Sequence, residues 1–175
     1  AYGSYKAALN LKGTLPPSHF IRAATHLANQ KALQEATKFA TEIQEKYGGI
    51  LEGPDQLKFL NLRARLHLQN NETEQAVKIL KALVEKDPHN GEALILLGLT
   101  HLELQDSDRA AIAFERAART ETHAADALLE HARMLVGQSK YAEAVKLLRQ
   151  AQEIRPRNYV EDYLQAVEHA AQSHR

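Results

Sequence analysis

The chain has 175 residues, of which 44% are hydrophobic and 25% charged, as in an ordinary folded globular protein. Its 22 Lys and Arg balance its 22 Asp and Glu, so it lacks the excess of positive charge that general nucleic-acid binders and polybasic membrane-surface segments carry. No apolar run approaches the length of a membrane-spanning helix, and without cysteine the chain has no disulfide, thiol nucleophile or thiolate zinc site.

The first segment, residues 1–16, precedes any repeating pattern, and Pro16-Pro17 separates it from the rest of the chain. It begins Ala1-Tyr2-Gly3-Ser4, with no initiator Met and no signal peptide. We expect this segment to be the remnant of an upstream repeat or a processed or trimmed end.

From residue 17 onward the sequence repeats with a period of 34 residues. Pro88 and Pro156 stand 68 residues apart, which is twice this period, and divide the chain into segments 57–90, 91–124 and 125–158. A further segment, 17–50, fits the same register after an insertion of six residues, Leu51 to Gln56. Small residues recur at the eighth and twentieth positions, namely Ala24, Ala64, Gly98, Ala132, Ala36, Ala76, Ala110 and Ala144. Such residues predict close helix crossings.

Each segment reads as two helices separated by a polar break. Apolar residues recur every three to four positions on both sides of breaks such as Asp106-Ser107-Asp108, where Asp or Ser caps the second helix, and Pro ends it. Residues 159–175 add a single terminal helix with Tyr159, Tyr163, Val167 and Ala170 on its apolar stripe. We therefore predict nine major helices between residues 17 and 175.

This pattern resembles the tetratricopeptide repeat family, whose repeats have a large apolar residue at position 4, small residues at 8, 20 and 27, and Pro at 32. The chain departs from it at position 11, which holds Leu27, His67, His101 and Leu135 instead of an aromatic residue, and at position 32 of the first and third repeats. The resemblance implies an all-α, right-handed superhelical solenoid of antiparallel helix pairs, made of four repeats and a capping helix at 159–175.

Catalytic and metal-binding motifs are weak by comparison. The nine histidines include His67 and His101, which share position 11 in adjacent repeats, and His123 and His131, eight residues apart. No HExxH motif or convergent third ligand accompanies them, so we interpret them as structural. An all-helical repeat also offers no nucleophile elbow or phosphate loop. We therefore expect neither an enzyme nor a cofactor or bound metal.

The family resemblance implies a concave groove lined by the first helices of the repeats. Family positions 2, 5, 6, 9, 12 and 13 point into this groove, and the carboxylate-clamp set of Lys and Asn at positions 5 and 9 is missing here. An apolar middle between polar ends suits an amphipathic helix or an extended apolar peptide, although the same leucines are equally explained by packing against the next repeat. The predicted partner site comprises Asn61, Arg65, Ile95, Leu96, Leu99, Leu129, Glu130 and Arg133.

The function that these features favour is a scaffold or adaptor, bacterial in origin, that binds a protein or peptide partner. One alternative is an accessory domain of a larger multi-repeat or enzyme assembly, and another is an RNA-binding helical repeat, which the 34-residue period and zero net charge disfavour. Self-association remains open. We expect a cytoplasmic or periplasmic and cell-envelope location, and the absence of cysteine favours the latter.

Overall fold

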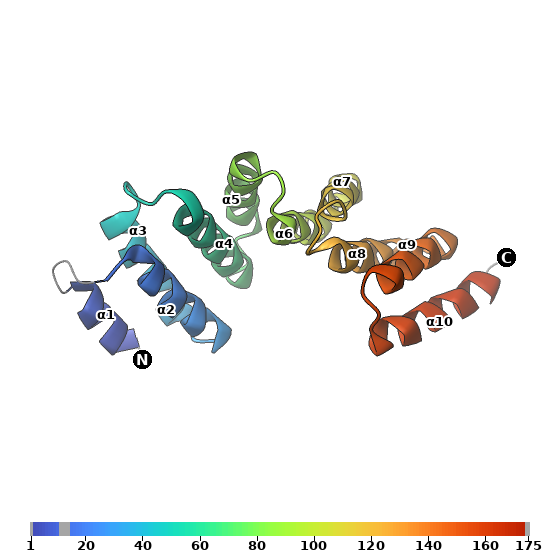
Figure 1. The fold of residues 1–175 in the computed structure, drawn as a ribbon, viewed down its shortest axis with the longest axis horizontal. Helices are drawn as coiled ribbons and strands as arrows, with labels where there is room; N and C mark the ends of the chain where they lie inside the picture. Colours follow the sequence, from blue (N-terminus) through green and yellow to red (C-terminus); the bar gives the residue numbers. More distant parts are fainter. Residues whose placement is uncertain (1, 11–14, 174–175) are drawn as a thin grey trace. The chain divides into compact units, whose positions relative to one another are not determined.

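The computed structural model describes residues 2–10 and 15–173, and this part of the chain is helical, with no strand. The all-α prediction is therefore confirmed (Figure 1). Nine helices follow one another from residue 17 to 173, preceded by a short one. The ten helices are α1 (Tyr2–Asn10), α2 (Pro17–Asn29), α3 (Leu33–Tyr47), α4 (Gly53–Gln69), α5 (Thr73–Lys86), α6 (Gly91–Glu103), α7 (Ser107–Ala117), α8 (Ala124–Gly137), α9 (Tyr141–Ile154) and α10 (Asn158–Ser173).

The turns inside the four helix pairs share one backbone geometry. Its central residue stands at position 15 of the 34-residue register in each repeat. At each of these turns a residue with a side chain takes a left-handed conformation, with φ between 59° and 61°: Lys31, Asn71, Gln105 and Ser139. In every case the next backbone N–H donates to the carbonyl five residues back, as Asp106 does to His101 at 2.9 Å. This is a Schellman-type helix end, which satisfies carbonyls that the helix leaves free.

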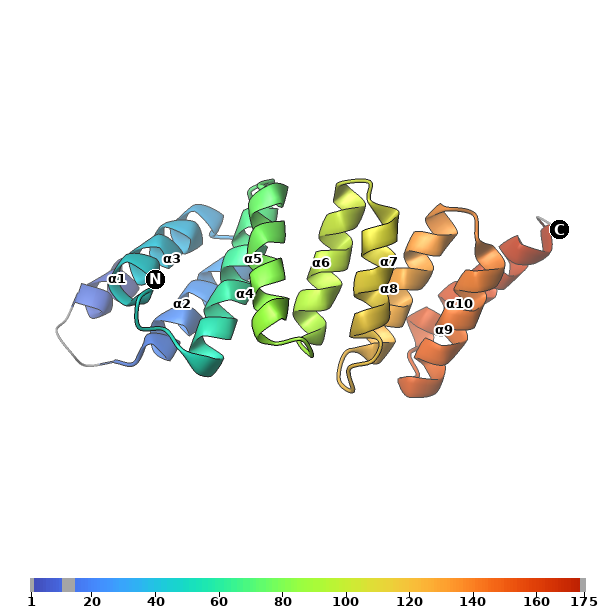
Figure 2. The same cartoon turned by 90° about the horizontal axis from the view of Figure 1, so that it is seen from above.

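The chain divides into two compact units, residues 1–86 and 87–175, which we describe separately. In the first unit α2 pairs with α3 and α4 with α5 (Figure 2). The helix α1 packs on α2 and α3, where Tyr2 and Tyr5 contact the fully buried ring of Phe39, at centroid distances of 6.0 and 6.1 Å. Tyr2 also donates a hydrogen bond to Glu42 (2.9 Å), and Lys6 forms an ion pair with it (3.0 Å).

The predicted insertion Leu51–Gln56 is mostly helical. Leu51 is buried in the core of the first unit, and α4 already begins at Gly53, with Pro54 in its first turn. Proline is common at this position, because the first N–H groups of a helix have no hydrogen-bond partner within the helix. The extra residues therefore lengthen α4 at its start.

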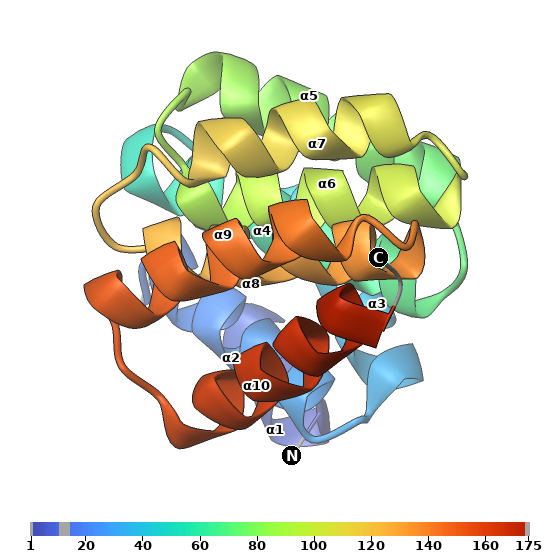
Figure 3. The ribbon, with the colours of Figure 1, turned by 90° about the vertical axis from the view of Figure 1, so that its right-hand side faces the viewer.

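In the second unit α6 pairs with α7 and α8 with α9, and α10 packs on α9. The end-on view of Figure 3 shows α7 lying over α6, and α9 over α8. Gly98 of α6 lies against Phe114 of α7: a Cβ atom on this glycine would stand 2.5 Å from a ring carbon of Phe114. A small residue at position 8 is thus required where a phenylalanine fills position 24.

The predicted cap of α7 is present at Asp106, which accepts a hydrogen bond from the N–H of Arg109 (3.1 Å).

The terminal helix α10 follows the predicted stripe only in part: Val167 is buried and Tyr163 half-buried, as predicted, but Tyr159 is not. Val160, Leu164 and Val167 are its buried residues, whereas Tyr159 is 51% exposed. The aliphatic residues at a spacing of four and three face the core, and Tyr159 lies at its edge, where its hydroxyl accepts a hydrogen bond from Arg157 (2.6 Å). A tyrosine at such an edge keeps its polar end in contact with polar groups.

None of the helices in the described ranges is both long and apolar enough to cross a membrane.

Candidate functional site

The eight residues of the predicted groove fall into both units. Asn61 and Arg65 lie on α4 in the first unit, and the other six lie on α6 and α8 in the second. In the first unit Arg65 donates a hydrogen bond to the Asn29 side chain of α2 (3.3 Å). This hydrogen bond links α4 to α2, the first helices of neighbouring repeats. The side-chain oxygen of Asn61 is buried and has no hydrogen-bond partner within the described chain.

The second unit carries a strip of half-buried apolar side chains on its first helices. Ile95, Leu99 and Leu102 of α6, with Val136 of α8 and Tyr163 of α10, pack against the core and remain partly open to solvent. We name these five residues the apolar strip. Leu96 is also half-buried, and its carbonyl accepts a hydrogen bond from Thr100 (2.6 Å).

Leu129 does not face solvent, contrary to the sequence prediction. It is only 4% exposed and belongs to the same core cluster as Phe114, Leu148 and Leu164. Leu148 of α9, the helix that pairs with α8, and Leu164 of α10 contribute to this core. Position 5 of the fourth repeat is therefore part of the packing between consecutive repeats.

Glu130 and Arg133 form an ion pair one turn apart on α8, with an N–O distance of 2.7 Å. The Arg133 side chain is 49% exposed and the Glu130 side chain 22%. Burial raises the pKa of the nearby Tyr163 hydroxyl, while the charge of Arg133 lowers this pKa and the charge of Glu130 raises it. A polar pair thus borders the apolar strip, and Arg133 retains exposed donors for a further acceptor.

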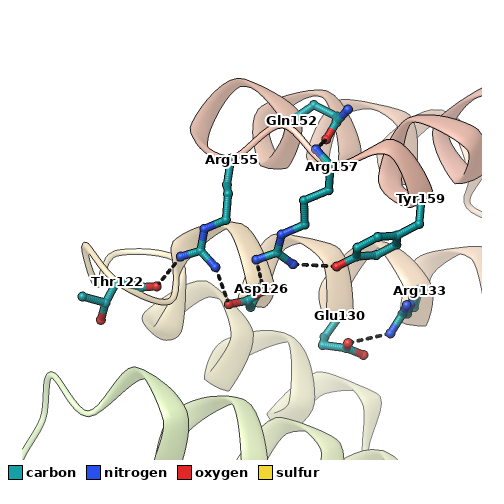
Figure 4. Close-up of polar contacts among 8 residues, drawn as sticks. All are labelled: Thr122, Asp126, Glu130, Arg133, Gln152, Arg155, Arg157 and Tyr159. Carbon is teal, nitrogen blue, oxygen red and sulfur yellow. Dashed lines mark hydrogen bonds and ion pairs between the residues drawn. The ribbon is translucent and has the colours of Figure 1, made fainter.

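A second polar cluster lies at the start of α8 and joins it to the loop before α10 (Figure 4). Asp126 forms ion pairs with Arg157 (2.6 Å) and Arg155 (3.2 Å), from opposite sides of Pro156. Arg157 also donates to Tyr159, and the hydrogen bonds to Tyr159 and Asp126 raise its pKa above the usual arginine value. Sequence reasoning missed this cluster, although the Arg155-Pro156-Arg157 segment directly before a terminal helix was a visible signal.

In the described part of the chain, no three His, Asp or Glu side chains converge as metal ligands would. His67 of the first unit pairs instead with Glu72 (2.5 Å), and His131 of the second lies beside the Phe114 ring, with centroids 6.0 Å apart.

A family model described as "Tetratricopeptide repeat" matches residues 61–122 and 104–159, which together make up more than half of the chain. No curated protein sequence matches the chain.

Among the solved structures with a similar fold, three illustrate the resemblance. A tetratricopeptide repeat protein from Parabacteroides merdae ATCC 43184 superposes with a TM-score of 0.75, at 23% identity over 98% of this chain and 66% of that one. YrrB, described as a tetratricopeptide repeat protein with an unusual peptide-binding site, gives 0.69 at 16% identity, over 98% and 81%. The Yersinia enterocolitica type III secretion chaperone SycD, in complex with a peptide of the translocator YopD, gives 0.60 at 22% identity, over 66% and 95%.

Proposed function

Since the chain belongs to the tetratricopeptide repeat family, we propose that it is a protein-interaction module that binds a peptide or helix of a partner protein. The second unit is the better candidate for contact, through the apolar strip and the Glu130–Arg133 pair beside it. Members of such repeat families are typically not catalytic, and a scaffold or adaptor role requires no reacting group.

The apolar strip is the observation that carries this proposal. Five apolar side chains from three helices pack against the same core cluster and are neither fully buried nor fully exposed. A partner that covered them would remove apolar surface from water, which stabilises a complex by about 25 cal/mol per Å² before the costs of association. The bordering Arg133 supplies a charged donor that would set the orientation of a bound carboxylate or carbonyl group.

The comparisons support a peptide as the ligand class. SycD was solved with a peptide of YopD, and YrrB is described by its peptide-binding site. The zero net charge of the whole chain supports a protein partner over a nucleic acid, and a gel-shift assay at low salt with single-stranded RNA tests this choice.

The test of the partner site is affinity capture with two matched variants. Leu102→Glu with Val136→Glu places charges at the edge of the apolar strip, and Ile112→Glu places one on α7, where Ile112 is already 58% exposed. Proteins retained by the parent and by Ile112→Glu should be lost from the strip variant, while circular dichroism shows that all three remain helical. Retention of the same proteins by a folded strip variant would show that the apolar strip is not the contact surface.

A further inference from the structure

The second unit contains a pocket of about 500 Å³ between α7, α8 and α9. Leu135 of α8 and Leu147 of α9 give it an apolar lining, and the acidic residues Glu115 of α7 and Glu143 of α9 also line it. His131 of α8 is a further lining residue. By helical periodicity this side of α8 is turned away from Glu130 and Arg133, so the pocket and the apolar strip are different surfaces.

The charges nearest to His131 are both negative. Burial holds the pKa of the imidazole below its usual range, while Glu115 and Glu143 act to raise it. The ring is therefore largely uncharged near neutral pH and presents a flat face and a nitrogen acceptor. Neither carboxylate is ion-paired with any residue that the structure describes, and both are exposed. Other charged groups in the lining are Asp108, Lys140 and Lys146, so the formal charge of the pocket is negative.

A pocket between α3 and α4 of the first unit shares part of this register, without residues of the following helix α5, and has a different lining. It is smaller, at about 200 Å³, and has Thr41 where the second unit has Glu115, and Arg63 where it has His131. Arg63 donates a hydrogen bond to Gln44 there, at 3.0 Å. Part of the hollow thus recurs in the first unit, where Glu45 is an acidic lining residue, whereas the second-unit pocket has both Glu115 and Glu143 beside an uncharged ring.

The two units also differ in net charge. Residues 1–86 contain 12 Lys and Arg against 8 Asp and Glu, and residues 87–175 contain 10 against 14, which gives formal charges of +4 and −4. A negative field around the second unit favours the approach of a cationic ligand.

We propose that the pocket between α7, α8 and α9 binds an arginine side chain from a basic segment of a partner protein. The leucines accommodate the methylene stem, Glu115 and Glu143 accept hydrogen bonds from the guanidinium, and its flat face lies against the His131 ring. Arginine fits better than lysine because its guanidinium is planar and weakly hydrated, whereas an ammonium is a compact and strongly hydrated charge. This site lies outside the apolar strip and does not depend on the function proposed for it.

The direct test is an NMR titration of the 175-residue chain with N-acetyl-arginine amide. N-acetyl-citrulline amide is the matched probe, since it has the same shape without the charge. The arginine probe should shift the amide signals of Glu115, His131 and Glu143, with an affinity about five-fold or more above that of citrulline, as expected for two partly exposed ion pairs. The signals of Thr41 and Arg63 serve as an internal control and should not move.

Two variants identify the groups responsible. Glu115→Gln with Glu143→Gln keeps the size of both exposed side chains and should remove the preference for arginine over citrulline. His131→Arg copies the first-unit residue and should abolish binding, because its own guanidinium occupies the carboxylates. Equal binding of citrulline, equal binding of N-acetyl-lysine amide, equal shifts in the first-unit pocket, or an unchanged affinity in the glutamine variant would each overturn the assignment.

Discussion

Replacing Gly98 by alanine tests the close contact between α6 and α7. The added Cβ would stand 2.5, 2.7 and 2.9 Å from three ring carbons of Phe114. Normal separations between non-bonded carbon atoms are about 3.5–4.0 Å, so the ring or the helix must move by about 1 Å. Phe114 is fully buried, and the ring therefore has no solvent into which it can turn.

The net effect is a balance of two opposing contributions. Overpacking a core of this kind typically costs about 1–3 kcal/mol. Alanine in place of glycine inside a helix stabilises the folded state by about 0.5–1 kcal/mol, because alanine loses less conformational entropy on folding. We therefore expect Gly98→Ala to lower the free energy of unfolding by about 1–2 kcal/mol, which corresponds to a fall in Tm of roughly 2–8 °C for a chain of this size.

Thermal unfolding followed by circular dichroism measures this effect, and the chain provides a matched control. Gly137 lies at the end of α8, and a Cβ there would meet no atom within 4 Å. Gly137→Ala should accordingly raise stability by about 0.4–1 kcal/mol. The two substitutions are chemically the same and differ only in what the new methyl group contacts, so they should change Tm in opposite directions.

A double variant separates steric conflict from any other cause. The second and fourth repeats pair Ala64 with Leu80 and Ala132 with Leu148 at the positions that Gly98 and Phe114 occupy in the third. Phe114→Leu leaves room for a methyl group, so adding Gly98→Ala to it should cost nothing further, and the coupling between the two changes should reach about 1–3 kcal/mol. If Gly98→Ala raises Tm as Gly137→Ala does, the close approach of α6 to the ring is refuted.

Two further predictions concern packing and the turns. Leu129→Ala should lower the free energy of unfolding by about 2–5 kcal/mol, because the Leu129 side chain is only 4% exposed and lies in the core. Urea denaturation measures this loss, and a loss under about 1 kcal/mol would show that Leu129 is not a core residue. Gln105→Gly should raise the free energy of unfolding by up to about 1 kcal/mol, because glycine adopts a φ of 59° without steric conflict. Gln105→Ala retains a Cβ atom and the same conflict, so it should give no gain.

The repeat could be predicted from sequence because its signal is local. Ala64, Ala110 and Ala144 are small because two helices cross there, and each is completely buried in the structure. The same positions recur at a fixed period, so they set the register of nine helices without knowledge of the three-dimensional fold. The first residues were harder to interpret, since α1 is defined by contacts of Tyr2 and Tyr5 with Phe39, more than 30 residues away.

The site was less predictable because the sequence does not distinguish a leucine that lines a groove from a leucine buried in a core. Leu99 remains partly open to solvent and Leu129 does not, although both are leucines on the first helix of a repeat, at positions 9 and 5 of the register. The ion pairs of Asp126 with Arg155 and Arg157 join residues about 30 positions apart, and no spacing rule connects such residues. Contacts between repeats therefore had to come from the structure.

The four left-handed turns also bear on how such a chain grows and shortens. Each turn closes a helix pair with hydrogen bonds that span only a few residues, such as the bond from the Lys140 N–H to the Leu135 carbonyl. The entropy lost in closing so short a loop does not depend on how many pairs come before or after it. Duplication or loss of one whole 34-residue segment would therefore leave the remaining turns chemically intact, and the length of the array can vary in evolution while each hairpin keeps its own geometry.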